Sequence, residues 1–400
     1  MKILVLSFFY PPDLSAGSFR IEAFMEELRK QTSAKDEIHL LTNFPNRYMT
    51  FTSEVPAFEQ IGNIHIHRCQ LRSQGKGFVS QVKRFLQYSH FVKKYTRNEK
   101  YDLVFATSSR MFTAALGVDI AVKQGCPSYI DIRDLFVDTF KSLFSKKLNL
   151  TLGQYFKWVE KKTFTRASQI NVVSPSFSDH IKSVYPTIND IDLFTNGVDD
   201  IFIDYKPNDL PAELSDYFSK LPERPTFLYA GNIGRGQDLD IILPSMALKY
   251  PDYDFVLVGD GNAKVKLEEE IEKKSCNNIF FFSPISREFI PTLYAKSTLL
   301  FLHLGKSEAL EKVIPSKLFE YAASGKPILA GIQGYSKDFC RKEISNCQVF
   351  SPGNIEEATK ALDLLSMETS ERSEFIEKFN RTKIITDLVS NFLELNKVKK

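Results

Sequence analysis

The chain has 400 residues, of which 43% are hydrophobic and 25% are charged, and its formal net charge is +3 at pH 7. This length exceeds what one hydrophobic core usually covers, so we expect two domains of about 200 residues each, and the composition excludes a disordered chain. So small a net charge gives no support for nucleic-acid binding.

The first residues, MKILVLSFF, could be mistaken for a secretory signal, because a lysine precedes an apolar run. The pair Pro11 and Pro12 ends this run in the way that a buried first strand ends before a loop, so we predict a strand. The longest apolar runs elsewhere, such as 298–304, fall far short of the ~20 residues that a membrane span requires. No segment is therefore expected to cross a bilayer.

Short apolar runs alternate with longer helical patterns along both halves of the chain, which predicts parallel strands joined by crossover helices. In the first half we expect strands at 3–7, 39–42, 64–67, 103–106, 128–132 and 169–173. In the second half we expect them at 226–229, 254–258, 279–282, 298–302 and 327–329. An acidic, proline-containing stretch after 196–199 that ends near Arg224 is the expected hinge.

This rhythm predicts an α/β protein with two doubly wound domains that face each other. In such sheets ligands collect at the carboxyl ends of the strands, so the active site is expected in a cleft between the halves. After the first strand, Ser15, Ala16, Gly17 and Ser18 precede a helix that contains Arg20. Gly17 could let the backbone approach a phosphate, although a tight turn without a ligand explains these residues equally well.

The segment 76–100 interleaves basic and apolar residues at helical spacing, and it includes Lys93 and Lys94. Such a basic amphipathic helix can lie on an anionic membrane surface. The alternative is a helix that packs on the core with a solvated basic face. We assign Trp158 and His303 to packing, since neither lies in a recognisable constellation.

The loop 231–237, GNIGRGQ, follows a predicted strand and precedes a helix, so it offers flexible backbone and one cation, Arg235, for a phosphate. The later turn VGDG at 258–261 has the same arrangement, but helix packing explains it equally well. The residues Gly305, Lys306 and Ser307 resemble the end of a P-loop, but the glycine that this motif needs at position 300 is Leu300. The P-loop interpretation therefore fails.

Two acidic pairs, Asp190 with Asp192 and Asp238 with Asp240, imitate a metal-binding DxD motif. The first pair lies before the hinge and the second opens a helix, so capping or solvent exposure explains both. The five cysteines contain no CxxC pair, which favours a reducing compartment over a disulfide framework or a zinc site. The expected location is therefore the cytoplasm.

The stretch 313–325, VIPSKLFEYAASG, predicts a short helix with Pro315 in the first helical position and Gly325 at the stop. The free amides of a helix start bind phosphate, and Lys317 adds a full charge there. Glu320 lies on the same helical face, where its carboxylate could accept hydrogen bonds from ribose hydroxyls. The alternative is a solvated ion pair on an ordinary surface helix.

Six segments in order, YPPDLSAGS, TNGVD, LYAGNIGRGQDL, FVLVGDG, NIFFFSPISREFIPTLYAKS and IPSKLFEYAASGKPILA, resemble GT4-type glycosyltransferases of the GT-B fold. The resemblance covers nearly the whole chain. Within that family it is similar to bacterial O-antigen and capsule enzymes of the N-acetyl-L-fucosamine transferase type. It implies two Rossmann-like domains, an acceptor-binding domain at 1–200 and a nucleotide-sugar-binding domain at 201–378, and a C-terminal helix at 379–400 that crosses back.

The resemblance also implies an activity. Such enzymes move a sugar from a nucleotide donor, here expected to be a UDP-sugar, to a lipid-linked glycan, with retention and without a metal or another cofactor. The chain is then expected in the cytoplasm or on the inner face of the plasma membrane. A sugar-nucleotide epimerase of the same architecture and a non-catalytic donor-binding partner subunit are the alternatives.

The implied site residues fall into groups by role. Lys317 is assigned to the donor diphosphate, Glu320 to the ribose, and the glycine loop at Gly17 to phosphate or sugar. The turn after Ser283, which contains Ile285, is assigned to the base. The remaining donor-binding residues are the helix start at Pro315 and Ser316, and Asn232, Arg235 and Gln237 of the glycine loop.

The chain departs from the family pattern at several positions. Many relatives carry two glutamates eight positions apart, but the earlier position here is Lys312, and Glu308 or Glu311 might substitute. Where relatives place an arginine and a lysine after the first strand of the second domain, this chain has Asn232 and Gln237. The segment 131–134, DIRD, resembles an Arg-Asp pair that would place Arg133 or Asp134 at the reacting sugar, whereas a local salt bridge is the alternative.

Overall fold

The computed structural model describes residues 1–45, 54–72, 78–108, 111–135, 137, 146–220 and 224–397. The chain divides into two compact units. Unit 1 comprises Met1–Thr195 together with Thr382–Lys400, and unit 2 comprises Asn196–Arg381. The sequence placed its boundaries at 200 and 378, a few residues away from these. No helix among the described residues is long and apolar enough to cross a membrane.

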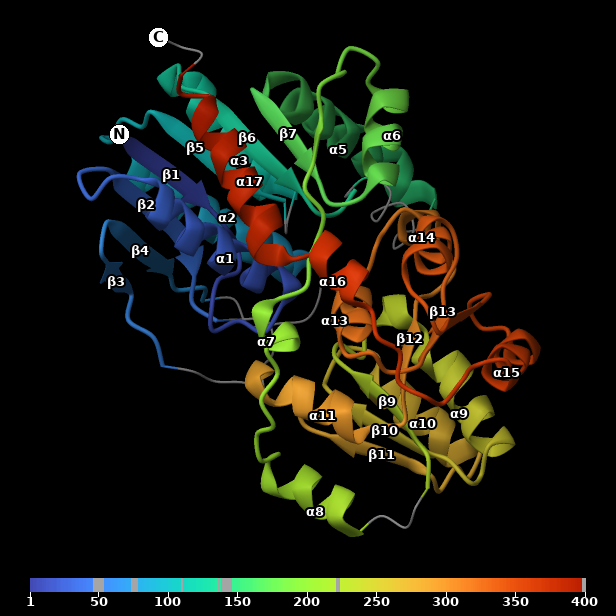
Figure 1. Ribbon diagram of the computed structural model, residues 1–400. Coiled ribbons are helices and arrows are strands. Elements are labelled where there is room, and N and C mark those ends of the chain that lie inside the picture. The colour runs from blue at the N-terminus through green and yellow to red at the C-terminus, as the bar shows by residue number, and fades with distance from the viewer. Residues whose placement is uncertain are drawn as a thin grey trace. The chain divides into compact units, whose positions relative to one another are not determined.

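Unit 1 contains an eight-stranded sheet in the order β3-β4-β2-β1-β5-β6-β7-β8 (Figure 1). All pairs are parallel except β3 with β4. The strands are β1 (Lys2–Leu6), β2 (Glu37–Asn43), β3 (Phe58–Ile61), β4 (Ile64–Cys69), β5 (Leu103–Thr107), β6 (Ser128–Ile132), β7 (Gln169–Val172) and β8 (Asp192–Leu193). The strand order reverses at β1, whose neighbours are β2 and β5, so the carboxyl end of β1 lies at the switch point of the sheet.

The crossover segments of unit 1 are helical, as the alternating pattern predicts. They are α1 (Ala16–Gln31), α2 (Phe78–Thr96), α3 (Met111–Gln124), α5 (Lys146–Arg166) and α6 (Pro175–Val184). The C-terminal helix α17 (Arg381–Glu394) belongs to this unit except for its first residue. Its Phe392 ring packs against Phe24 and Phe105, with ring centroids 5.8 and 5.5 Å apart. The end of the chain is therefore part of the core of unit 1.

Unit 2 contains a six-stranded parallel sheet in the order β11-β10-β9-β12-β13-β14 (Figure 1). The strands are β9 (Thr226–Ala230), β10 (Asp254–Val258), β11 (Ile279–Phe282), β12 (Leu299–His303), β13 (Ile328–Gly331) and β14 (Cys347–Phe350). The order reverses between β9 and β12, which places the switch point of this sheet at their carboxyl ends.

The helices of unit 2 are shorter on average than those of unit 1. They are α7 (Asp200–Ile203), α8 (Ala212–Lys220), η1 (Arg235–Gln237), α9 (Leu239–Lys249), α10 (Lys264–Lys273), η2 (Arg287–Phe289), α11 (Ile290–Lys296), α12 (Glu308–Glu311), α13 (Ser316–Ala323), α14 (Tyr335–Glu343), α15 (Ile355–Asp363) and α16 (Ser373–Lys378). The terminal helix expected at 379–400 corresponds to α17, and Asn380, which lies between α16 and α17, forms an isolated bridge with Val198.

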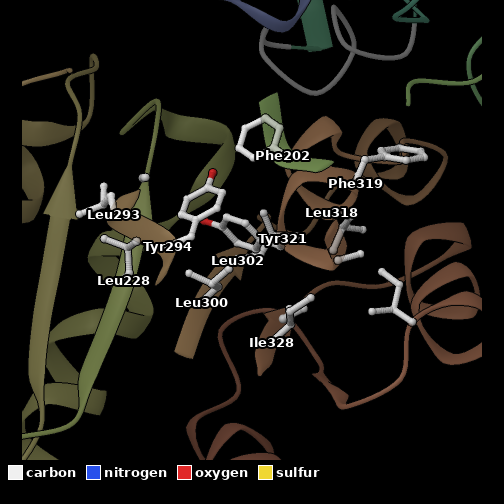
Figure 2. Packing of buried hydrophobic residues seen from close by; sticks show 14 of the residues in the cluster. Phe202, Leu228, Leu293, Tyr294, Leu300, Leu302, Leu318, Phe319, Tyr321 and Ile328 are labelled. Atoms are coloured by element: carbon white, nitrogen blue, oxygen red, sulfur yellow. The ribbon is translucent and has the colours of Figure 1, made fainter. Parts of the chain in front are cut away.

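The sheet of unit 2 is buried on both faces, because alternate residues of each strand enter different hydrophobic clusters. Leu228 and Ala230 of β9 belong to one cluster and Phe227 and Tyr229 to the other. Figure 2 shows the first cluster, in which side chains of the strands, α11 and α13 meet. This double burial explains why the strands appear in the sequence as continuous apolar runs.

The expected hinge differs from what the structure shows. Phe202, Leu210 and Leu214, which lie in the acidic stretch before β9, are buried in the same cluster. The stretch therefore belongs to the packed body of unit 2, and the division between the units falls at Thr195 and Asn196. The acidic side chains had suggested a solvated linker, but apolar residues at helical spacing between them anchor α7 and α8.

Candidate active site

Helix α13 separates an apolar face from a charged face. Leu318, Phe319 and Tyr321 point into the core of unit 2 (Figure 2). Lys317 and Glu320, three residues apart, are only partly buried. The helix begins at Ser316, so Pro315 is its N-cap and not its first helical residue as the sequence suggested. The reason is its ψ of 132°, which is extended backbone, while the ring still keeps φ at −60°.

The ammonium of Lys317 lies over the carboxyl end of β9. A Cβ atom added to Gly231 would come 2.1 Å from its Nζ and 2.5 Å from its Cε. The φ of Gly231 is +143°, which side-chain-bearing residues rarely adopt. Gly231 is therefore the residue that makes room for the lysine side chain, and this tight fit places the ammonium at the switch point between β9 and β12.

Lys317 is a desolvated cation. Burial lowers the pKa of its ammonium, and the charge of Glu320 partly opposes this. No carboxylate oxygen lies within 4.0 Å of Nζ among the residues that the structure describes. Its nearest aromatic partner is Tyr229, whose ring centroid is 6.0 Å from Nζ. The site thus holds positive charge that the described chain does not neutralise at contact distance.

Glu320 is held by a tyrosine from a neighbouring helix. The hydroxyl of Tyr294 in α11 donates a hydrogen bond of 3.1 Å to Glu320 Oε2. Tyr294 is fully buried, and burial raises the pKa of its hydroxyl, so it stays a donor at neutral pH. The carboxylate is therefore fixed in direction while one of its oxygens, Oε1, still has the capacity to accept hydrogen bonds from a ligand.

The glycine loop after β9 is closed by its own polar side chains. Gln237 Oε1 accepts hydrogen bonds from Asn232 Nδ2 and from the backbone N–H of Gly234, both at 3.1 Å. The backbone N–H of Arg235 donates to Asn262 Oδ1 at 3.1 Å, whereas its exposed guanidinium has no partner among the described residues. The loop is thus rigid, and it presents one unpaired cation.

The second glycine turn supports the first. A Cβ atom on Gly259 would lie 1.8 Å from the carbonyl oxygen of Gly231, and one on Gly261 would lie 2.2 Å from that of Ile233. The two turns therefore pack backbone against backbone. For the turn at 258–261 this favours the packing interpretation over a separate phosphate site.

His303, at the carboxyl end of β12, has a larger role than packing. It is fully buried, its Nδ1 is 2.6 Å from the carbonyl oxygen of Gln237, and its Nε2 accepts a hydrogen bond of 2.9 Å from the backbone N–H of Gly353. This pairing requires the neutral ring with the proton on Nδ1. His303 thus ties the end of the glycine loop to the loop after β14. Its position at a strand end was the available signal in the sequence.

The other candidate residues of unit 2 have different settings. Ile285 follows β11 and packs, partly buried, against the core cluster. Glu311 accepts a hydrogen bond of 2.8 Å from Gln333 Nε2, while the side chain of the exposed Glu308 forms no hydrogen bond or ion pair with the described residues. Of the two glutamates that might substitute for the one replaced by Lys312, Glu308 is therefore the one whose carboxylate is not already engaged.

The predicted residues of unit 1 lie after its central strands. Gly17 is the second residue of α1, whose N-cap Ser15 accepts a hydrogen bond of 3.2 Å from the N–H of Ser18. The helix thus begins one residue before Gly17, where the sequence suggested a loop. Arg133 Nη1 donates a hydrogen bond of 3.0 Å to the carbonyl oxygen of Ala16, so the segment after β6 is joined to the start of α1.

Asp134 is exposed and lines a large cavity of unit 1. The backbone N–H of Arg133 donates to Ser108 Oγ at 2.9 Å, which joins the segments after β5 and β6. Gly17 and Arg133 together line a separate small cavity. The structure thus brings Gly17 and Arg133 together, and it places Asp134 on a different surface.

A buried ion pair beside this region was missed by the sequence interpretation. Arg20 donates to Asp131 through Nε and Nη2, both at 3.0 Å, and Asn171 Nδ2 donates to the same carboxylate at 2.6 Å. Arg20 also donates to the carbonyl oxygens of Phe194 and Thr195. The pair joins α1, β6 and β7. Its signal in the sequence is an arginine on the apolar face of a helix, one residue before Ile21.

The acidic pairs behave differently from each other. Asp192 is not merely exposed or a cap, as expected: it accepts hydrogen bonds from Tyr129 at 2.6 Å, Asn391 at 2.8 Å and Gln169 at 3.1 Å. These bonds join β6, β7 and α17, which is why Asp192 is partly buried. Asp240 opens α9 and pairs with Lys266 at 2.5 Å. No cluster of metal-ligand type was found within the described ranges.

Comparisons with known proteins agree with this architecture. The family described as glycosyl transferases group 1 matches residues 214–381, which is most of unit 2. The solved structure of sucrose-phosphate synthase from Thermosynechococcus elongatus aligns with a TM-score of 0.73 and 14% identity, over 100% of this chain and 98% of that one. The fold is the GT-B fold of two Rossmann-like domains, and residues 214–381 are similar to the glycosyl transferases group 1 family.

Two further relatives have more specific descriptions. A protein of Escherichia coli (strain K12) that is assigned as the colanic acid biosynthesis glycosyl transferase WcaI is 24% identical over 356 residues, which cover 84% of each chain. The structure of Anabaena Alr3699/HepE in complex with UDP and glucose has a TM-score of 0.60 and 17% identity, over 99% of this chain and 97% of that one.

Proposed function

We propose that this chain transfers a sugar from a UDP-sugar, with retention and without a metal, to a lipid-linked glycan in bacterial surface polysaccharide biosynthesis. The single observation that carries the proposal is the desolvated ammonium of Lys317, which has no carboxylate at contact distance among the described residues and lies beside Glu320 at the switch point of unit 2. A diphosphate would neutralise the ammonium, and a ribose would satisfy the carboxylate.

The chemistry follows from the charges in this site. Breaking a glycosidic bond to a diphosphate leaves negative charge on the departing group while the sugar becomes positive. Lys317, Arg235 and the free amides at the start of α13 would stabilise the departing charge, since preorganised cations and dipoles act without reorganisation. These cations would stabilise the charge that a metal ion stabilises in other transferases. Arg133 and Asp134 would act on the donated sugar and the acceptor.

The description of two relatives supports the direction of the proposal. HepE was solved with UDP and glucose, and WcaI is assigned to colanic acid biosynthesis. Donor binding by unit 2 and acceptor binding by unit 1 are proposals for this chain, as is an N-acetyl-L-fucosamine-type donor. We further propose that the chain works in the cytoplasm, on the inner face of the plasma membrane, with α2 against the anionic lipid surface.

Ligand-dependent thermal unfolding tests donor binding. A ligand that binds only the folded state at 100 times its Kd stabilises a protein by about 2.7 kcal/mol, so a panel of UDP-, GDP- and TDP-sugars should raise the Tm for one base. The variant Lys317→Ala should lose this shift, and Lys306→Ala, which changes an exposed lysine, should keep it. Equal shifts for Lys317→Ala and the unaltered protein would contradict the assignment.

Product analysis separates the alternatives. A sugar-nucleotide epimerase would interconvert donor sugars without an acceptor, whereas a transferase would need the acceptor to release UDP rapidly. The non-catalytic subunit is favoured by one observation, Lys312 in the place of a glutamate. It would bind the donor and show no turnover with any acceptor, and Lys312→Glu would then be expected to create activity.

A further inference from the structure

A large apolar groove opens on unit 1. It has a volume of about 910 Å³ and is lined by side chains of α2, α3 and α5. This volume lies near the upper end of the ~300–1,000 Å³ that is usual for ligand pockets. None of the three helices has been given a function beyond packing, apart from the basic face of α2.

The floor of the groove is aromatic. Phe112 of α3 packs between Phe85 of α2 and Phe156 of α5, with ring centroids 5.4 and 5.7 Å apart. Phe156 is buried together with Met111 and Val159 in a small cluster separate from the central core of the unit. The groove therefore has a firm hydrophobic base that the fold itself maintains.

The rim exposes large apolar side chains that a solvated surface would not favour. Leu86 of α2 is 60% exposed, and Tyr155 and Trp158 of α5 are 51% and 58% exposed. Tyr155 and Trp158 stack with their ring centroids 6.1 Å apart. The assignment of Trp158 to packing was therefore wrong, because a core residue would be buried. A concentration of exposed apolar groups around one groove indicates a binding surface.

Two of the three helices around the groove, α2 and α5, are basic. The sequence of α2 has four basic residues, including Lys93 at the groove, and no acidic residue. Lys162 of α5 also lines the groove, where its Nζ is 5.5 Å from the centroid of the Trp158 ring and 3.0 Å from Asp119 Oδ1. Lys93 has no partner within the described ranges. Because Asp119 pairs with Lys162, Lys93 is the lining cation left to meet an anionic group, and it favours an occupant that is apolar along most of its length and anionic at one end.

One end of the groove reaches the residues after β5 and β6. Ser108 and Asp134 line it, and Asp134 is the residue that we assigned to the sugar and acceptor side. Ser108 is hydrogen-bonded to the backbone N–H of Arg133. An amphiphile whose chain lies in the groove would therefore present its polar end beside the catalytic segment of unit 1.

We propose that this groove binds the hydrocarbon chain of the lipid-linked acceptor, with the anionic phosphate of that acceptor near Lys93 and the glycan toward Asp134. The identity of the lipid rests on the proposed function, whereas the binding of an anionic amphiphile in the groove does not. It predicts that the enzyme recognises the chain of its acceptor directly and does not only dock on the bilayer surface. Affinity should then grow with chain length.

The fluorescence of Trp158, which is the only tryptophan in the chain, reports on the groove directly. Titration with hexyl phosphate and with decyl phosphate, both below the concentrations at which they form micelles, should shift the emission of this tryptophan. The two Kd values should differ on the order of a hundredfold, because each additional buried methylene tightens binding by about fourfold. Equal Kd values for the two chains would overturn the proposal.

Two leucines give a matched pair of variants. Leu86→Asp places a carboxylate at the groove and should weaken decyl phosphate binding at least tenfold. Leu248→Asp changes a leucine of α9 in unit 2 that is 53% exposed, and it should leave binding unchanged. Unchanged binding in Leu86→Asp would overturn the proposal. A dimer in sedimentation experiments that Leu86→Asp dissociates would overturn it too, since the groove would then hold a second copy.

Transfer assays distinguish a failure of the groove assignment from a failure of the proposed sugar transfer. If sugar is transferred equally well to short-chain and long-chain acceptors, the groove assignment fails and the function stands. If decyl phosphate binds in the groove but no acceptor accepts sugar, the function fails and the groove assignment stands.

Discussion

Replacing Lys317 with methionine removes the ammonium but keeps an unbranched apolar stem of similar length over Gly231. We expect turnover to fall by about 10²- to 10³-fold, which is about 3–4 kcal/mol of lost transition-state stabilisation, as when one preorganised electrostatic contact is removed. The loss should appear mainly in kcat, because the negative charge on the diphosphate grows as the bond breaks.

The same substitution should not destabilise the free protein. Burial lowers the pKa of Lys317, which means that the folded state disfavours the charged ammonium relative to the unfolded state. Methionine avoids that desolvation, so the free energy of unfolding at pH 7 should be unchanged or higher in the variant. A residue whose removal lowers activity but not stability is there for a ligand and not for the fold.

Release of the nucleoside diphosphate measures turnover, and denaturant unfolding of the ligand-free protein measures stability. Lys306→Met is the matched control, because Lys306 is exposed in the same region of unit 2 and both properties should stay as in the unaltered protein. A near-normal rate for Lys317→Met would refute the catalytic role. A clear loss of stability in the ligand-free protein would refute the argument from desolvation.

Three further outcomes follow from the contacts described above. Gly231→Ala should lower turnover at least tenfold, because the added Cβ would displace the Lys317 side chain. Gly236→Ala is the control in the same loop, where a Cβ meets open space, and it should have normal kinetics. Similar rates for the two variants would contradict the packing argument. Arg20→Met should destabilise the protein by about 3–5 kcal/mol in urea unfolding, because it leaves the buried carboxylate of Asp131 without its charge partner. A loss of about 1 kcal/mol or less would show that this carboxylate is solvated or protonated. Burial lowers the pKa of His303 to about 4 from 6.5. The contribution of the neutral ring to the free energy of unfolding, about 3 kcal/mol in total, is therefore fully present above pH 6.5 and is lost as the pH falls toward 4. Thermal unfolding of His303→Asn across this range should show a smaller loss than the unaltered protein, and equal slopes would refute the neutral, doubly hydrogen-bonded ring.

Much of the fold could be predicted because the central strands are buried on both faces. The strands β6 and β10 lie where the apolar runs at 128–132 and 254–258 placed them. The strands that the sequence missed lie at or near sheet edges, where burial is incomplete: β3 is largely exposed, β8 has two residues, and β14 is only partly buried. Their residues carry no continuous apolar signal, and only pairing with a neighbour makes them strands.

The site divides in the same way between local and long-range features. Lys317 and Glu320 were found because three-residue spacing on a helix is local in the sequence. The contact of Gly231 with Lys317 depends on a φ of +143° and on chain segments 86 positions apart, and neither leaves a trace in the sequence pattern. The ion pair between Arg20 and Asp131 is hidden for the same reason, since 111 positions separate the two residues.

The partners of two buried arginines show, by contrast, why the proposed function depends on the ammonium of Lys317. Arg372 is buried, and its guanidinium donates hydrogen bonds to backbone carbonyl oxygens that include those of Ser345, Ala322 and Lys326. Arg20 is buried against a carboxylate. Each of these cations is satisfied by the chain, as a cation that serves the fold must be. Lys317 is partly buried without such a partner among the described residues, so an anion from outside would offset the cost of its desolvation.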